Sequence, residues 1–121
     1  MQHLNKTKEF GRTASQRKAL WSTMLGSLIM KEKIETTEAK AKELKGRIDK
    51  LINKAKKHPE AGAARLAVRR DLKKYVPAAA AEKLMGEFLQ RFESRKSGYT
   101  RVIKLAPRKS DNARLAIIEF V

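Results

Sequence analysis

The stretch at residues 33–57 constrains the fold most strongly, because it predicts a short strand followed at once by a long helix. Ile34 lies in an extended pattern with the β-branched Thr36 and Thr37, and either hydroxyl can cap the free N–H groups of a helix start. Apolar residues then recur at three- and four-residue steps, as on one buried helix face. They are Ala41, Leu44, Ile48, Leu51, Ile52 and Ala55.

The other faces of that helix are basic, and an excess of positive charge extends over the whole chain. The 121 residues include 29 Lys and Arg against 13 Asp and Glu, a formal net charge of +16. This excess repels itself unless an anionic partner is near, and the partners that need no matching sequence are nucleic acids and anionic membrane surfaces. The length fits one modest core. We expect a basic N-terminal arm at residues 1–14 and a single globular domain at residues 15–121.

The residue types that most catalytic and metal sites require are scarce. Cysteine is absent, the six glycines are scattered, and the histidines are His3 and His58. These facts argue against thiol catalysis, cysteine-rich zinc sites, a glycine-rich phosphate loop and a histidine-based triad. We expect no catalysis, cofactor, metal or small-molecule substrate. The longest apolar-rich run, residues 19–30, is too short to span a bilayer, and the N-terminus lacks a hydrophobic signal core, which predicts an intracellular protein.

Three more helices are predicted. Ser15 is a good N-cap for the first, which ends near Lys31. Trp21 could stack on a base, but it is in phase with the apolar face of this helix, as core residues more often are. The second covers about residues 60–73, and the third opens at Pro77 and follows a clean amphipathic pattern to residue 92. In the helix at 60–73 we expect Ala63, Leu66, Ala67 and Leu72 to face inward and Arg65, Arg69 and Arg70 to face outward.

The apolar period changes to two near the C-terminus. Residues 99–105 and 115–121 read as strands, and residues 107–113 read as the turn between them. The two strands predict an antiparallel hairpin, and the strand at Ile34 is the obvious third member of the sheet. The chain is therefore expected to be an α+β protein with about four helices.

Several cations outside the central helix are candidates for nucleic-acid contacts. Arg17 and Lys18 lie in the first turn of a helix, where the helix dipole disfavours positive charge, and such local conflicts are often functional. Tyr99 lies near Arg101 and can stack on an unpaired base, which folded RNA offers more often than duplex DNA does. The complete candidate set is Lys6, Lys8, Arg12, Arg17, Lys18, Arg95, Lys96, Tyr99, Arg101, Arg108 and Lys109. The arm at residues 1–14 suits either a mobile terminus or a segment that orders on a polyanion.

Four blocks of the sequence carry a resemblance to a known family. They are GRT and RKA at 11–13 and 17–19, IETTEAKAKEL at 34–44, GYTRVIKL at 98–105 and AIIE at 116–119. These blocks closely resemble, in the same order, the bacterial large-subunit ribosomal protein L17 family. The resemblance covers essentially the whole chain, and the second block is far more specific than a basic patch.

The resemblance implies a two-layer α+β body, with helices on one side of a small three-stranded mixed sheet, preceded by a basic N-terminal arm. It also implies a component of the large subunit of a cytoplasmic bacterial ribosome, bound to its RNA beside neighbouring proteins near the exit side of the polypeptide tunnel. By the same resemblance, one group of residues looks like RNA contacts of the arm and first helix, and a second corresponds to hairpin positions. The first is Arg12, Arg17 and Lys18, and the second is Tyr99, Arg101, Arg108 and Lys109.

Two other functions remain open on the residues alone. One is a free-standing DNA-binding protein, although no stretch has the tight glycine-containing turn and polar recognition helix of a helix-turn-helix regulator. The other is a module for an anionic membrane, which would need a long helix with a strongly hydrophobic face and little other core. The C-terminal hairpin favours a packed globule instead.

Overall fold

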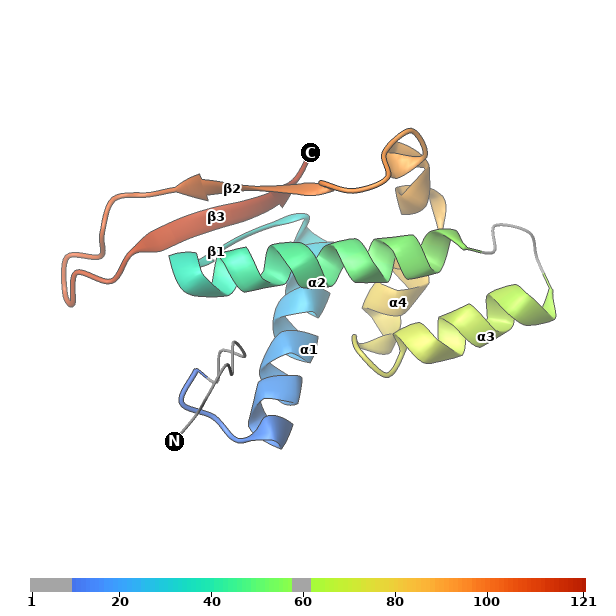
Figure 1. Cartoon of the computed structure of the whole chain (residues 1–121), viewed down its shortest axis with the longest axis horizontal. Coiled ribbons are helices and arrows are strands. Elements are labelled where there is room, and N and C mark those ends of the chain that lie inside the picture. Colours follow the sequence, from blue (N-terminus) through green and yellow to red (C-terminus); the bar gives the residue numbers. More distant parts are fainter. Residues whose placement is uncertain (1–9, 58–61) are drawn as a thin grey trace, which may run out of the picture.

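The structure is a computed structural model that describes residues 10–57 and 62–121. This part of the chain contains four α-helices, one 3-10 helix and three strands. They are α1 (Ala14–Lys31), β1 (Lys33–Thr37), α2 (Glu38–Lys56), α3 (Ala63–Leu72), α4 (Ala78–Leu84), η1 (Glu87–Phe92), β2 (Thr100–Lys104) and β3 (Leu115–Phe120). The sheet lies along one side of the molecule and the α-helices lie on the other (Figure 1). The α+β class is confirmed.

Strand β3 is the centre of a three-stranded sheet, and both neighbours run antiparallel to it. Ile118 pairs with Ile34 of β1 on one side and with Val102 of β2 on the other. The C-terminal hairpin and the third strand at Ile34 are therefore confirmed. The mixed sheet that the resemblance implied is wrong, because β1 and β2 point the same way but are separated by β3, so no parallel pair forms.

Helix α2 covers the inner face of the sheet and buries the whole apolar stripe expected from the sequence. Each stripe residue is at most 5% exposed, and the stripe shares one core cluster with Ile118 and Phe120 of β3. Thr37 is the N-cap, but its hydroxyl makes no capping hydrogen bond. The Glu38 amide donates to the Arg114 carbonyl at 2.9 Å instead, so the turn before β3 satisfies the start of α2.

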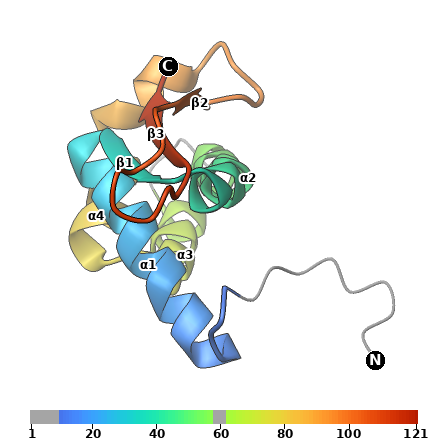
Figure 2. The same cartoon turned by 90° about the vertical axis from the view of Figure 1, so that its left-hand side faces the viewer.

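Helix α1 begins two residues earlier than an N-cap at Ser15 would allow. Thr13 is the N-cap: its hydroxyl accepts from the Gln16 amide, while the Gln16 side chain accepts from the Thr13 amide at 2.9 Å. This reciprocal pair is a capping box. Trp21 is 4% exposed, which confirms it as a core residue. Figures 1 and 2 both show the N-terminal end of α1 pointing away from the sheet.

Helix α3 does not bury the face expected from the sequence. Leu66 is 44% exposed, and both alanines of the expected inner face are exposed too, whereas Leu72 is buried as predicted. The guanidinium of Arg65 turns inward and donates to the Met85 carbonyl. Met85 is the C-cap of α4 and its carbonyl lacks a helical partner, so the cationic side chain of Arg65 satisfies it. The alanine-rich face offered too little apolar area to compete.

The single helix expected across residues 77–92 is broken. Helix α4 ends at Leu84, Gly86 adopts an extended conformation, and the 3-10 helix η1 follows. Glycine loses more conformational entropy in a helix than other residues do, which makes it a natural break point. The break lets Phe88 pack edge-to-face on Phe120 of β3, with ring centroids 4.9 Å apart. The predicted apolar residues pack on the core, Leu89 only partly buried and the others buried, but they do so in two separate segments, α4 and η1.

Candidate nucleic-acid interface

The first candidate group lies where the chain enters α1. The Arg12 guanidinium donates to the Phe10 carbonyl at 2.8 Å, and the Arg17 guanidinium donates to the Arg12 carbonyl at 2.6 Å. Phe10 in turn packs edge-to-face on Trp21, with ring centroids 5.3 Å apart. These contacts give Arg12 and Arg17 a structural part in ordering the start of α1. Lys18 is exposed, whereas Lys6 and Lys8 lie outside the described residues.

The second group lies on the hairpin. Arg108 and Lys109 are in the turn between β2 and β3, which projects past the start of α2 in Figure 1. The Arg108 guanidinium pairs with Asp111 at 3.2 Å, while Lys109 is exposed and has no acidic partner within residues 10–57 and 62–121. On the strands, Arg101 pairs with Glu119 at 2.8 Å across the sheet. Of the three cations, Lys109 is the one whose charge is not already balanced.

The third group, Arg95 and Lys96, lies in the exposed loop between η1 and β2. This loop is at the opposite end of the molecule from the hairpin tip (Figure 1). The candidates therefore do not converge on one patch. The structure places them in three separate regions of the surface.

Tyr99 does not belong to the surface, and its expected role in base stacking is wrong for this conformation. The residue is 0% exposed and its ring packs edge-to-face on Phe92 at 5.3 Å. Its hydroxyl donates to Asn53 Oδ1 at 2.5 Å and lies 3.3 Å from Lys56 Nζ. Tyr99 precedes β2, so the alternation of that strand does not govern its side chain, which packs into the core. Arg101 lies within β2 and is exposed, so closeness in sequence did not indicate a shared surface.

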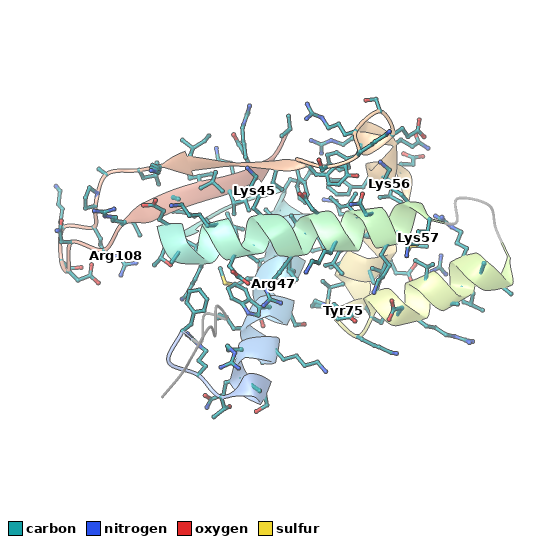
Figure 3. All side chains as sticks on the ribbon, in the orientation of Figure 1. Lys45, Arg47, Lys56, Lys57, Tyr75 and Arg108 are labelled. Atoms are coloured by element: carbon teal, nitrogen blue, oxygen red, sulfur yellow. The ribbon has the colours of Figure 1, made fainter. Side chains whose placement is uncertain are left out.

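Lys56 belongs to the basic faces of α2, but its ammonium is used for contacts within the protein. Its ammonium donates to the Phe92 carbonyl at 2.8 Å and to the Arg95 carbonyl at 2.5 Å, in addition to its contact with Tyr99. Figure 3 shows Lys56 directed from α2 toward the segment after η1. Its charge holds the loop before β2 against the helix.

A basic cleft that the sequence did not reveal lies between α1 and α2. One part has a volume of about 440 Å³ and an adjoining part about 270 Å³, and they share Leu25, Arg47 and Tyr75. Figure 3 shows Arg47 and Tyr75 in the region between α2, α1 and α3. The cationic residues that line the two parts outnumber the single acidic one, Glu43. They are Arg17, Lys18, Lys42, Arg47, Lys50 and Lys54.

The turn after α3 presents Tyr75 to this cleft. The amides of Tyr75 and Val76 both donate to the Leu72 carbonyl, at 3.0 and 3.1 Å. Val76 is buried, whereas the Tyr75 side chain is 44% exposed. Lys54 Nζ lies 4.8 Å from the centre of the Tyr75 ring and 2.7 Å from Asp71. The hydrogen bond from Lys54 holds the pKa of Asp71 below its usual value and raises the pKa of Lys54.

Sequence reasoning missed this aromatic residue although a signal was present. Tyr75 directly follows Lys73 and Lys74, so it has basic neighbours just as Tyr99 has. The two tyrosines could be told apart only by knowing which one the core covers. The α1–α2 packing that forms the cleft is a long-range contact with no local pattern.

Within residues 10–57 and 62–121, no three His, Cys, Asp or Glu side chains come together as ligands of a metal ion. No helix in the same residues is both long and apolar enough to cross a membrane.

The fold and the surface together define a small basic α+β protein whose cations are spread for contact with a polyanion. The family model described as "Ribosomal protein L17" matches residues 20–121, from within α1 to the end of the chain. The chain belongs to the ribosomal protein L17 family. It is therefore a structural, non-enzymatic protein of a bacterial ribosome, which is a cytoplasmic particle.

Individual relatives are similar over nearly their full length. A "Large ribosomal subunit protein bL17" of a Hydrogenobaculum species is 47% identical over 123 residues, covering 100% of this chain and 99% of the relative. A protein of the same description from Staphylococcus carnosus is 45% identical, covering 94% of this chain and 98% of the relative. One from Shouchella clausii is 44% identical, covering 93% and 97%.

Proposed function

We propose that the protein is a structural component of the large ribosomal subunit that binds folded large-subunit RNA mainly through its phosphates and so supports translation. Its relatives are described as large ribosomal subunit proteins, which supports the choice of particle. The observation that carries the mode of binding is a set of exposed cations without an acidic partner in the described part of the chain. They include Lys18, Lys31, Lys33, Lys45, Lys50, Arg70, Lys96 and Lys109.

The placement of these cations favours phosphate contacts over base reading. They lie on α1, β1, α2, α3 and two loops, so a folded RNA could touch the protein from several sides. Lysine ammonium groups act on phosphates as point charges and carry no sequence information. In this proposal, residues 1–14 are the arm and residues 15–121 the body, and Lys6 and Lys8 extend the contacts of Lys18. Neighbouring large-subunit proteins near the exit side of the polypeptide tunnel complete its surroundings.

Sedimentation and a salt series test the proposal. The tagged full-length protein should sediment with large ribosomal subunits in a cell extract. Its affinity for large-subunit RNA should fall linearly when log affinity is plotted against log salt, because each phosphate contact releases counterions. Sedimentation with the nucleoid, or an affinity for the RNA that does not change with salt, would contradict the proposal.

A matched pair of triple variants separates unpaired from paired cations. Replacing Lys18, Lys96 and Lys109 with Gln should reduce the salt slope by about 2–3, at roughly one phosphate contact for each lysine. The control replaces three lysines that already face a carboxylate, namely Lys73, Lys74 and Lys104. It removes the same formal charge, and we expect a smaller loss of slope. Equal losses in both variants would show that net charge alone, and not the unpaired positions, governs binding.

A further inference from the structure

The basic cleft between α1 and α2 combines features that simple phosphate contacts do not require. Tyr75 is half-exposed at the point where the two parts of the cleft meet, and Lys54 holds its ring from α2. Lys18 and Lys50 line the same cleft, and neither has an acidic partner among the described residues.

Two buried N–H donors at the cleft lack acceptors. The indole Nε1 of Trp21 and the Nε of Arg47 have no hydrogen-bond partner within residues 10–57 and 62–121. Both residues line the cleft, Trp21 is only 4% exposed, and the Arg47 guanidinium lies over the indole ring at 4.8 Å. Buried polar groups are normally paired, and these two donors are available to an acceptor that enters the cleft. The flexible Arg47 side chain has to shift for such an acceptor to reach the indole.

We propose that this cleft binds a single unpaired nucleotide extruded from the large-subunit RNA, with its base stacked on Tyr75. The proposal rests on the RNA-binding function above and gives it a specific site. An exposed aromatic ring provides a stacking surface for any base. Lys18 and Lys50 neutralise the flanking phosphates, and Arg47 and Trp21 donate to oxygen acceptors of the nucleotide. No bond is made or broken, so the site is a binding site only.

An acidic peptide of a neighbouring protein is a poorer match to the cleft. Its carboxylates would pair with the lysines, but it would offer no planar ring to stack on Tyr75. A nucleotide supplies the planar ring, the anionic group and the oxygen acceptors in one unit. The chemistry of the cleft therefore favours RNA over protein.

Crosslinking of the unaltered protein tests the site directly. Large subunits that contain the full chain would be irradiated with ultraviolet light, digested with nuclease and protease, and analysed by mass spectrometry. We expect a nucleotide remnant on the peptide that contains Tyr75. A crosslink from Tyr75 to a peptide of another ribosomal protein, or nucleotide remnants on other peptides with none at Tyr75, would overturn the proposal.

Binding to large-subunit RNA with three single variants tests the role of each group. Tyr75→Leu removes no charge, so it should weaken binding about 5- to 100-fold at every salt concentration and leave the salt slope unchanged. Tyr75→Phe keeps the ring and should bind like the unaltered protein. Lys50→Gln should lower the salt slope by about 1. Melting curves would show that the Leu variant is folded.

The outcomes separate this inference from the proposed function. If the unaltered protein neither binds the RNA nor sediments with large subunits, the proposed function fails and the nucleotide site fails with it. If it binds with a steep salt dependence, but Tyr75→Leu and Tyr75→Phe bind equally well, only the nucleotide site is overturned.

Discussion

Two pairs of identical residue types have opposite roles in this molecule. Tyr99 is fully buried and bonded to Asn53, whereas Tyr75 is half-exposed in the basic cleft. The Lys56 ammonium donates hydrogen bonds to two backbone carbonyls, whereas Lys50 is exposed and has no acidic partner in the described part of the chain. At the scale of single residues, burial and nearby hydrogen-bond acceptors therefore decide whether a tyrosine or a lysine has a structural role or is available to a partner.

The buried hydroxyl of Tyr99 is expected to contribute to stability. Tyr99→Phe removes the hydrogen bond to Asn53 and one contact of Lys56, which should lower the free energy of unfolding by about 1–2 kcal/mol. Tyr75→Phe is the matched control, and its effect should stay within about 0.5 kcal/mol because the ring is at the surface. Urea denaturation of both variants gives the two values. Equal effects would mean that the Tyr99 hydroxyl contributes no net stability.

At the scale of elements, close approach between α1 and α4 depends on Gly26. A Cβ atom added there would lie 2.7 Å from Cδ and 3.0 Å from Cγ of Pro77, the residue that precedes α4. The proline ring has little freedom to move aside, so the helices would have to separate. Gly46 in α2 has nothing within 4 Å of an added Cβ. The same residue type therefore provides a packing contact in one helix and only open space in the other.

Replacing each of these glycines with alanine should give effects of opposite sign. Gly26→Ala gains up to about 1 kcal/mol in helix propensity but overpacks the contact with Pro77 at a cost of about 1–3 kcal/mol. We expect a net loss of stability. Gly46→Ala should be stabilising by about 0.5–1 kcal/mol, since it gains propensity without a clash. Thermal melting of the two variants would decide the signs, and stabilisation by both would show that Pro77 moves aside easily.

At the scale of the whole molecule, ion pairs join elements that are far apart in sequence. Glu32, at the junction of α1 and β1, pairs with Lys83 of α4 and Arg91 of η1. Glu38 at the start of α2 contacts Lys104 of β2 at 3.6 Å as well as Lys42. The pKa of Glu32 is lowered chiefly by its hydrogen bond from Arg91, and that of Glu38 by its hydrogen bond from Lys42. Asp71 with Lys54 links α3 to α2 in the same way.

These carboxylates predict a loss of stability in acid. Each has a lower pKa in the folded protein than its ordinary value of 4.5 for glutamate or 3.8 for aspartate. Their contribution is therefore complete above those ordinary values and is lost as the pH falls through the lowered ones. We expect the melting temperature to be steady between about pH 7 and pH 5 and to fall below about pH 4.5.

A triple variant provides the control for this acid effect. Glu32→Gln, Glu38→Gln and Asp71→Asn together should lower the melting temperature at neutral pH and flatten its decline in acid. High salt should weaken the same decline in the unaltered protein, because the pairs are partly exposed and screened. An unchanged decline in the triple variant would place the acid sensitivity in other groups.

The sequence by itself determined the features that local periodicity reports. The apolar stripe of α2, the strand before it and the C-terminal hairpin all match the structure, and the blocks around residues 34–44 and 98–105 identified the family. Periodicity works here because each of these patterns covers enough residues to specify both the type of element and its buried face.

Only the tertiary structure decided which neighbour each face would meet. It turned Arg65 of α3 inward in place of Leu66, broke the helix at Gly86 so that Phe88 could reach Phe120, and made the sheet wholly antiparallel. It also buried Tyr99 and left Tyr75 in a cleft between α1 and α2. Each outcome depends on contacts between distant parts of the chain, in which a carbonyl accepts a hydrogen bond from a remote donor or an aromatic ring packs against remote side chains. A local pattern contains no information about such partners.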